Sequence, residues 1–262
     1  MLFRTVYGPE LEAIYRFVLE ATIAEQTVSR EALHLAFVPR QASGDLGSAQ
    51  NVDDALLFLS SARLISDAPR FAATSLDRCV PFRLRCLRSL RRIERHEVSP
   101  KHPADPLFLL LLDELFIKPD CLFLPNMHVR ANQIGQVKEV GGLSREKTQA
   151  WQRVMSFLGL GRRVAGGFQC VFGPDLLLEI ARAWSPKQGT LQAFLEEHLT
   201  LLLPYARKED GDVALALQAP LDHLVRLGAL QLTQLQDSPS RPYFGERRLR
   251  SIRIIDGPCH GD

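Results

Sequence analysis

No uninterrupted apolar segment of this 262-residue chain is long enough to cross a membrane. A spanning helix needs about 20 predominantly apolar residues. The longest apolar run, PLFLLLLDELFIKPDCLFLP, is interrupted by Asp113, Glu114, Lys118 and Asp120. The opening residues, MLFRTVYGPELEAIYRF, carry acids where a secretory signal would be apolar. We therefore expect a soluble, cytoplasmic protein without a membrane partner.

Cysteine is scarce and irregularly spaced. The five cysteines are Cys79, Cys86, Cys121, Cys170 and Cys259. Their number is odd and no C-x-x-C occurs, which argues against a disulfide framework and against a zinc ribbon. We expect reduced thiols with a structural role.

Motifs for catalysis or cofactor binding are also missing. The chain has no phosphate-binding G-x-x-x-x-G-K-[ST], no G-x-G-x-x-G, no H-E-x-x-H and no G-x-S-x-G. Pro119-Asp120 resembles a fragment of a restriction-type nuclease core, but no acid-x-Lys follows at the required distance. We expect no enzymatic activity and no cofactor.

A metal site has only weak candidates. His96, Glu97 and His102 lie close together in sequence, but they fall in a proline-rich linker that makes a poor rigid cage. Cys259 and His260 belong to the terminal GPCHGD. We expect these side chains to be solvated and predict no metal site.

Net charge excludes a polycation. Lys and Arg total 32 against 30 Asp and Glu, a formal charge of +2. Any surface for nucleic acid must therefore be local.

Three segments of the chain resemble one another: FLSSARLI (58–65), FLGLGRRV (157–164) and LVRLGALQL (224–232). Each is predicted to end an amphipathic helix and to pass through small residues into a short strand. A second strand-like run follows each of them, APRFAATS, GGFQCVF and QDSPSRPYFGERRLRSIRII respectively. Further helical segments precede each copy, GPELEAIYRFVLEA and SREALHLAF being those of the first.

The second copy is the most regular. Ser144 is a good helix N-cap, and a buried stripe is predicted at Trp151, Val154, Met155 and Leu158. Gly159 and Gly161 suit the positive φ that ends a helix, and Gly166-Gly167 suits a hairpin turn.

The other two copies are less regular. In the first, the buried stripe is predicted at Val52, Ala55, Leu56 and Leu59. In the third, Pro220 is expected in the first turn of its helix, and VALAL before it alternates like a strand.

Two or three helices followed by a β-hairpin is the order of a winged helix, so the chain resembles the winged-helix superfamily. The resemblance covers most of residues 8–75, 104–183 and 189–256. It implies a mainly α protein with short β-hairpins, built from three consecutive winged-helix-like modules. The predicted modules are 1–76, 104–184 and 185–256, with an Arg-rich connecting helix and linker at 77–103 and a tail at 257–262.

Basic side chains gather in three places. Between Asp77 and Arg95, seven arginines face two acids, a local charge of about +5. The candidate contacts to DNA are Arg83, Arg88, Arg91 and Arg92 in that stretch; Arg145, Gln149, Gln152 and Arg153 on the second copy's helix; Arg162 and Arg163 in its wing; and Arg247, Arg248 and Arg250 in the last hairpin. A solvated helix or hairpin face, or pairing with acids, explains the arginines without DNA.

Acids in the other two copies argue against DNA contact there. Asp53 and Asp54 lie near the start of the first copy's helix, where they suit the helix dipole but repel phosphate. In the third copy, Asp222 and the acidic KEDGD loop also argue against insertion into a DNA groove.

Two functions follow as expectations. The first is a non-catalytic protein that binds double-stranded DNA, as an accessory subunit of a bacterial DNA-handling or defence system. The second is an assembly subunit whose modules bind a protein partner or a second copy, similar to the kite-type partners of SMC complexes.

Overall fold

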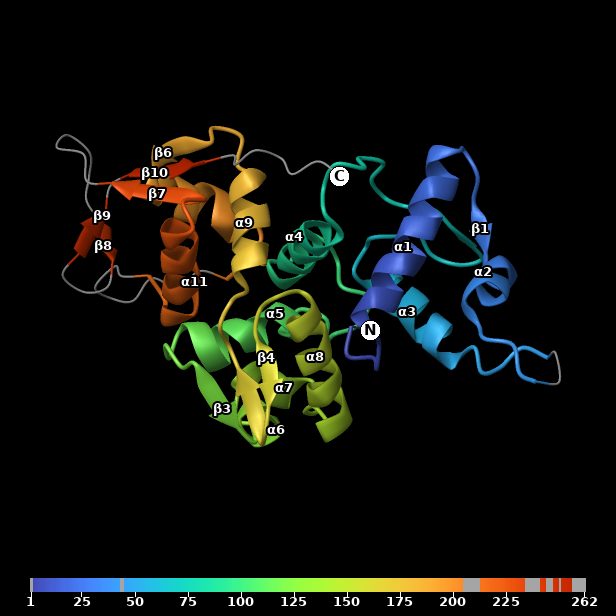
Figure 1. Ribbon diagram of the computed structural model, residues 1–262. Coiled ribbons are helices and arrows are strands. Elements are labelled where there is room, and N and C mark those ends of the chain that lie inside the picture. Colours follow the sequence, from blue (N-terminus) through green and yellow to red (C-terminus); the bar gives the residue numbers. More distant parts are fainter. Residues whose placement is uncertain are drawn as a thin grey trace. The chain divides into compact units, whose positions relative to one another are not determined.

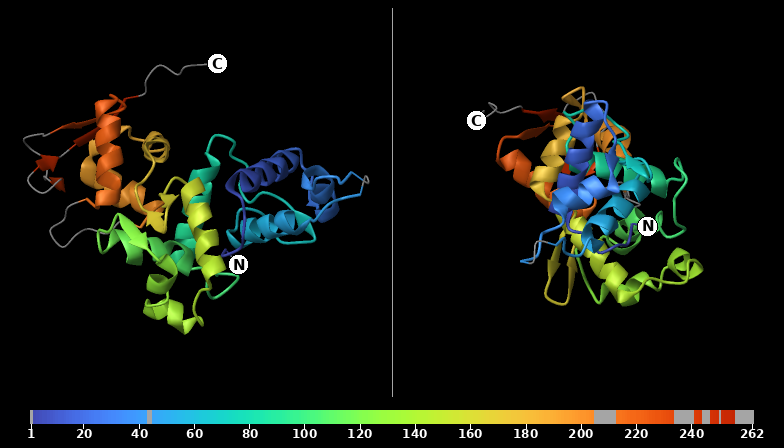
Figure 2. Two further views of the ribbon diagram at one scale, coloured as in Figure 1. Left: turned by 60° about the horizontal axis from the view of Figure 1, so that its bottom comes forward. Right: turned by 90° about the vertical axis from the view of Figure 1, so that its right-hand side faces the viewer.

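The computed structural model describes residues 2–42, 45–204, 213–233, 241–243, 247–249 and 251–255. Helices dominate, and the strands form small antiparallel sheets of two or three (Figures 1 and 2). This confirms the mainly α class with short hairpins. The chain divides into two compact units: unit 1 is Met1–Phe108 with Asn132–Leu158, and unit 2 is Leu109–Ala131 with Gly159–Asp262.

Unit 1 is a helical assembly with one two-stranded sheet. Its elements are α1 (Gly8–Ile23), β1 (Val28–Ser29), α2 (Arg30–Phe37), α3 (Gln50–Ser61), β2 (Arg70–Phe71), α4 (Phe82–Glu94), α7 (Gly135–Glu139) and α8 (Arg145–Phe157). Helix α1 packs against α3 and α8, and α2 packs against α3. The predicted stripe of α3, Val52 to Leu59, is buried in this core.

Helix α8 begins and packs as its sequence predicts. The Ser144 hydroxyl caps it by accepting a hydrogen bond from the Lys147 amide at 3.3 Å. The stripe that includes Trp151 and Leu158 is fully buried. The indole Nε1 of Trp151 donates to the carbonyl of Phe108 at 2.6 Å, which satisfies the one polar atom of that side chain.

Aromatic rings join α1, α4 and α8. Phe82, at the start of α4, lies 5.3 Å from Tyr15 of α1 and 6.1 Å from Phe157 of α8, ring centre to ring centre. These contacts hold the N-terminal end of α4 against the rest of unit 1.

Unit 2 contains the larger sheets. Its elements are η1 (Asp113–Ile117), β3 (Phe123–Pro125), α6 (Met127–Ala131), β4 (Arg162–Val164), β5 (Gly167–Gln169), α9 (Pro174–Arg182), β6 (Gln188–Thr190), α10 (Leu191–Ala193), η2 (Phe194–His198), η3 (Leu199–Leu201), α11 (Leu215–Arg226), β7 (Leu230–Thr233), β8 (Arg241–Tyr243), β9 (Arg247–Leu249) and β10 (Ser251–Ile254). Helix α5 (Leu107–Leu112) crosses the boundary between the units. Helix α11 packs against α9, β7 and η1.

Two sheets of unit 2 share one topology. Their strand orders are β3-β5-β4 and β6-β10-β7, and every pairing is antiparallel. In each sheet the strand earliest in sequence pairs with the latest, and the strand that follows the long helix lies at the other edge. The hairpin β4–β5 turns at Ala165-Gly166, where Gly166 has φ 79°, one residue earlier than predicted.

The first copy departs from the predicted hairpin. Strand β2 pairs with β1 rather than with the residues after α3. Where the chain folds back after α3, Ile65 and Ala73 form an isolated antiparallel β-bridge in place of a strand pair.

Two expectations for the third copy were wrong. Residues 215–217 of VALAL are helical, and Pro220 lies inside α11 rather than in its first turn. Pro220 lacks the N–H that would bond to the carbonyl of Ala216 four residues earlier. The Phe172 amide donates to that carbonyl instead, at 3.2 Å, so a tertiary contact satisfies it and the helix continues.

Candidate nucleic-acid interface

The arginine-rich stretch forms α4, as its apolar spacing predicts. Phe82, Leu84, Leu87, Leu90 and Ile93 are buried along one face. That burial fixes the helix, and it determines which arginines turn toward solvent.

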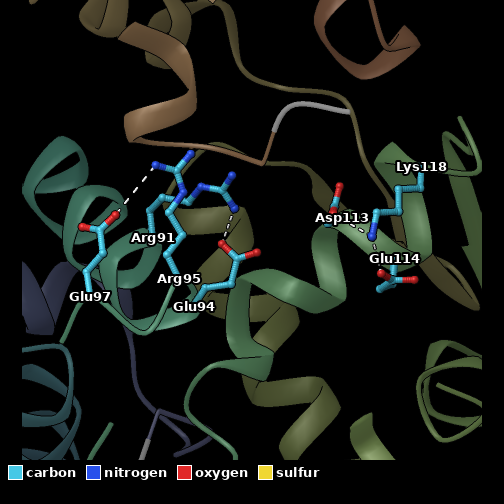
Figure 3. Close-up of polar contacts among 7 residues, drawn as sticks. All are labelled: Arg91, Glu94, Arg95, Glu97, Asp113, Glu114 and Lys118. Carbon is cyan, nitrogen blue, oxygen red and sulfur yellow. Dashed lines mark hydrogen bonds and ion pairs between the residues drawn. The ribbon is translucent and has the colours of Figure 1, made fainter. Parts of the chain in front are cut away.

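Several of the α4 arginines are paired with acids (Figure 3). Arg91 pairs with Glu94, and both side chains are mostly buried. Glu97 lies 3.7 Å from Arg92 and 3.8 Å from Arg95, in exposed pairs. Exposed pairs contribute at most about 1 kcal/mol, so phosphate can replace Glu97 at little cost, whereas Arg91 is held.

Arg88 is the most available cation of α4. Its side chain is exposed and has no hydrogen-bond or ion-pair partner in the part of the chain that the structure describes. Arg83 is half-buried. Of the four candidates on this helix, Arg88 and Arg92 are therefore placed best for contact with a ligand.

Helix α8 presents polar side chains opposite its buried stripe. Arg145 and Gln149 are exposed, one turn apart, and neither has a partner within the described ranges. Gln152 and Arg153 are half-buried, and the Arg153 guanidinium lies 5.9 Å from the centre of the Tyr7 ring. The first two turns of α8 thus carry donors that solvent alone satisfies.

The wing residues lie in unit 2. Arg162 and Arg163 are exposed on β4, where Arg162 Nε donates to Gln169 Oε1 at 2.7 Å. In the last hairpin, Arg247 and Arg248 belong to β9, opposite Tyr243 and Pro242 of β8. Arg250 lies outside the described residues.

The acids at the start of α3 are engaged by unit 1 itself. Asp53 lies 3.0 Å from His34 Nε2 and 3.6 Å from Arg30, and Asp54 lies 3.5 Å from Arg4. Asp53 lies in the first turn of α3, where a carboxylate suits the helix dipole as predicted.

A similar local pairing accounts for the charges that interrupt the apolar run. Lys118 lies 3.2 Å from Asp113 and also contacts Glu114 in η1 (Figure 3). The hydrogen bond to Glu114 raises the pKa of Lys118. Asp120, the acid of the nuclease-like fragment, accepts the Leu215 amide at 2.7 Å and so caps α11.

The cysteines with a described environment are free thiols. Burial raises the pKa of Cys86 to about 12 and also raises the pKa of Cys170. Within the described ranges, no three side chains of His, Cys, Asp or Glu are grouped so as to hold a metal ion. No described helix is both long and apolar enough to span a bilayer.

Two arginines outside the predicted set also line a hollow with Arg88 and Arg92. They are Arg63, just after α3, and Arg85 on α4. The spacing of Arg85, Arg88 and Arg92, at i, i+3 and i+7, was a signal for one shared helix face. Arg63 carried no such signal because only the tertiary fold brings it to α4.

Comparison of the chain with protein-family models, with curated proteins and with solved structures gave no match. Function is therefore inferred from the residues and their geometry.

Proposed function

We propose that the protein binds duplex DNA without catalysing a reaction, through consecutive winged-helix-like modules, as an accessory subunit of a bacterial DNA-handling or defence system. The observation that carries the proposal is the unpartnered, exposed pair Arg145 and Gln149 on α8. Helix α8 holds the position in its repeat that the groove-binding helix holds in helix-turn-helix proteins.

The repeated order of elements supports winged-helix-like modules. The first run consists of helix α5 with η1, strand β3, the short helices α6 and α7, the longer helix α8, and strands β4 and β5. The second run consists of helix α9, strand β6, the short helices α10 to η3, the longer helix α11, and strands β7 and β10. Both run helix, strand, helices, longer helix and two strands. In both, the first strand pairs with the last. The first copy keeps the helices but has a shorter sheet.

The chemistry of the α8 face suits a major groove. An arginine binds phosphate or the guanine edge, and a glutamine binds the adenine edge. Arg145 follows the helix N-cap, so its charge adds to the positive end of the helix dipole.

The test is fluorescence anisotropy of a labelled duplex of about 30 base pairs, titrated with the full chain at several salt concentrations. We expect log K to fall steeply with log salt. Arg145→Ala should weaken binding and reduce the magnitude of the salt slope by about 1. Arg16→Ala is the charge-matched control, because Arg16 is exposed on α1 and pairs only with Glu12 among the described residues. Equal losses in both variants, or no binding at low salt, would overturn the proposal.

Exposed apolar side chains favour the alternative, a protein-assembly subunit. Leu35 on α2 is 62% exposed, and Leu227 after α11 is 66% exposed. At the start of α3, Asp53 and Asp54 pair with Arg30 and Arg4, so these two cations are already neutralised by acids of unit 1. Sedimentation of the chain over a concentration range tests self-association. A dimer that Leu35→Ser or Leu227→Ser dissociates, with no DNA binding, would favour this function.

A further inference from the structure

A hollow of about 310 Å³ lies in unit 1 between α4, the residues just after α3 and the segment before α4. We call it the α4 pocket and define it by four arginines, Arg63, Arg85, Arg88 and Arg92, which all line it. Its volume is at the lower end of the range for small-ligand sites, which is about 300–1,000 Å³.

Arg85 is a buried charge without a counter-ion. Only 9% of it is exposed, and no carboxylate pairs with it in the described part of the chain. Its Nε donates to the Val80 carbonyl at 3.0 Å and its Nη1 to the Ser75 carbonyl at 3.5 Å, while Nη2 has no partner. The guanidinium also lies 5.9 Å from the centre of the Tyr15 ring. Buried charges are normally paired, so this environment favours an anion beside Arg85.

Arg63 occupies a position that favours glycine. It follows the C-cap of α3 with φ 56°, in the left-handed region. The equivalent residues after α8 and α11 are Gly159 and Gly228, with φ 81° and 72°. A left-handed arginine costs about 1–2 kcal/mol over glycine in backbone energy. Glu25 after α1 and His96 after α4 hold the same left-handed position, so the strain alone does not mark a site, and what distinguishes Arg63 is that its side chain lines the pocket.

The donors of Arg63 are incompletely used. Its Nη2 donates to the Ser99 carbonyl at 2.9 Å, and its buried Nε has no partner. No carboxylate pairs with it within the described ranges. Arg63 and Arg85, the two arginines outside the predicted set, therefore both line the same pocket with N–H groups that lack acceptors.

The pocket is strongly positive. Among its lining residues, four arginines face one acid, Asp77, which leaves a charge of +3. Asp77 already accepts the Cys79 amide at 2.8 Å. Burial and, second, the charge of Arg63 lower the pKa of Lys101, which pairs with Asp67.

The hydroxyls of the pocket narrow the chemistry. Thr74 donates to the carbonyls of Arg63 and Leu64, and Ser89 donates to the carbonyl of Ala62. The protons of these two hydroxyls are committed, so the donors left to a ligand are the guanidinium N–H groups and the hydroxyls of Ser75 and Tyr15, which also line the pocket. Planar guanidinium groups match the oxygens of phosphate, and a net charge of +3 suits a dianion.

We infer that the α4 pocket binds a phosphate monoester. A terminal phosphate carries up to two charges and can enter a hollow, whereas the diester backbone of a duplex carries one charge per phosphate and lies along an outer surface. The monoester can belong to a free nucleotide or to the phosphorylated end of a nucleic-acid strand. This site is separate from the face of α8 and does not depend on the proposed duplex binding.

The test is isothermal titration calorimetry of the full chain with inorganic phosphate and then with a nucleoside 5′-monophosphate. We expect a Kd below about 1 mM for the monophosphate. Arg63→Gly and Arg85→Met should each weaken binding at least about tenfold, since each removes charge-assisted hydrogen bonds. Glycine readily adopts the left-handed backbone of residue 63, so we expect Arg63→Gly to fold. The test therefore remains decisive if Arg85→Met does not fold.

A second arm identifies the source of the phosphate. A short single strand with a 5′-phosphate is compared with the same strand ending in a 5′-hydroxyl. A preference for the phosphorylated strand over the free nucleotide assigns the site to strand ends, and the reverse preference assigns it to nucleotides. Both outcomes support the inference.

Arg145→Ala separates this inference from the proposed function. It should leave the monophosphate affinity unchanged while it weakens duplex binding, and Arg63→Gly should do the opposite. The inference is overturned if no phosphate compound binds with a Kd below about 1 mM. It is also overturned if monophosphate affinity changes neither in Arg63→Gly nor when sulfate is added as a competitor at equal ionic strength.

Discussion

The ring of Phe157 at the end of α8 fills the space that a side chain at Gly8 would need. A Cβ on residue 8 would overlap the Cγ and Cδ2 atoms of that ring. Gly8 is the first residue of α1, so the backbone at the start of α1 lies directly against the Phe157 ring of α8. The packing of α1 on α8 therefore depends on the absence of one methyl group.

We expect Gly8→Ala to lower the free energy of unfolding by about 1–3 kcal/mol, the usual cost of overpacking. Urea unfolding followed by circular dichroism measures it. Gly135→Ala is the matched control, since a Cβ there meets nothing within 4 Å at the start of α7. A control that loses as much stability as Gly8→Ala would show that the Phe157 contact is not the cause.

The hydrogen bond of Trp151 should make the two tryptophans unequal. Trp151→Phe leaves the buried Phe108 carbonyl without its donor, which costs about 1–3 kcal/mol beyond the lost volume. Trp184→Phe in unit 2 replaces an indole, which packs 5.4 Å from Phe194 between ring centres, by a smaller aromatic ring. Urea unfolding of both variants should show the larger loss for Trp151→Phe, and equal losses would refute the role of the bond.

Exchange of residues at the left-handed helix ends should have opposite effects. Gly228→Ala places a side chain at φ 72° in open space, so backbone strain alone should destabilise the protein by about 1–2 kcal/mol. Arg63→Gly relieves the same strain and should leave stability unchanged or slightly higher. Differential scanning calorimetry gives both values. A clear loss in Arg63→Gly would mean that its side chain holds the fold and that strain is not its main effect.

Thiol reactivity should report unfolding of the core. At pH 8, a thiol with a pKa of about 12, such as Cys86, is ionised to about one part in 10,000. In a Cys259→Ser background, a disulfide reagent should label exposed Cys79 rapidly and Cys86 and Cys170 only after urea is added. Rapid labelling of Cys86 in the native protein would contradict the burial of the inner face of α4.

Local sequence sufficed where one helix face had to be buried. The stripes of α3, α4 and α8 and the Ser144 cap follow from apolar spacing and cap chemistry, both of which are short-range. The left-handed glycines at positions 159 and 161 follow for the same reason, because only the backbone within a few residues matters there.

The candidate site was less accessible to such reasoning. Arginine spacing indicated a basic helix, but the pairing of Arg91 with Glu94 and the exposure of Arg88 depend on how α4 packs. Arg85 looked like its neighbours in sequence, yet the fold leaves only 9% of it exposed and gives it no acid partner among the described residues.

The sequence by itself determined helices α3, α4 and α8, the hairpin after α8 and the local concentration of arginine, since each depends on neighbours along the chain. Only the tertiary structure decided where long-range partners meet. It supplies the Phe172 amide that lets α11 continue through Pro220, and the Asp120 carboxylate that caps that helix. It also brings Arg63 to the α4 pocket, because a hydrogen bond or a charge acts through space and not along the sequence.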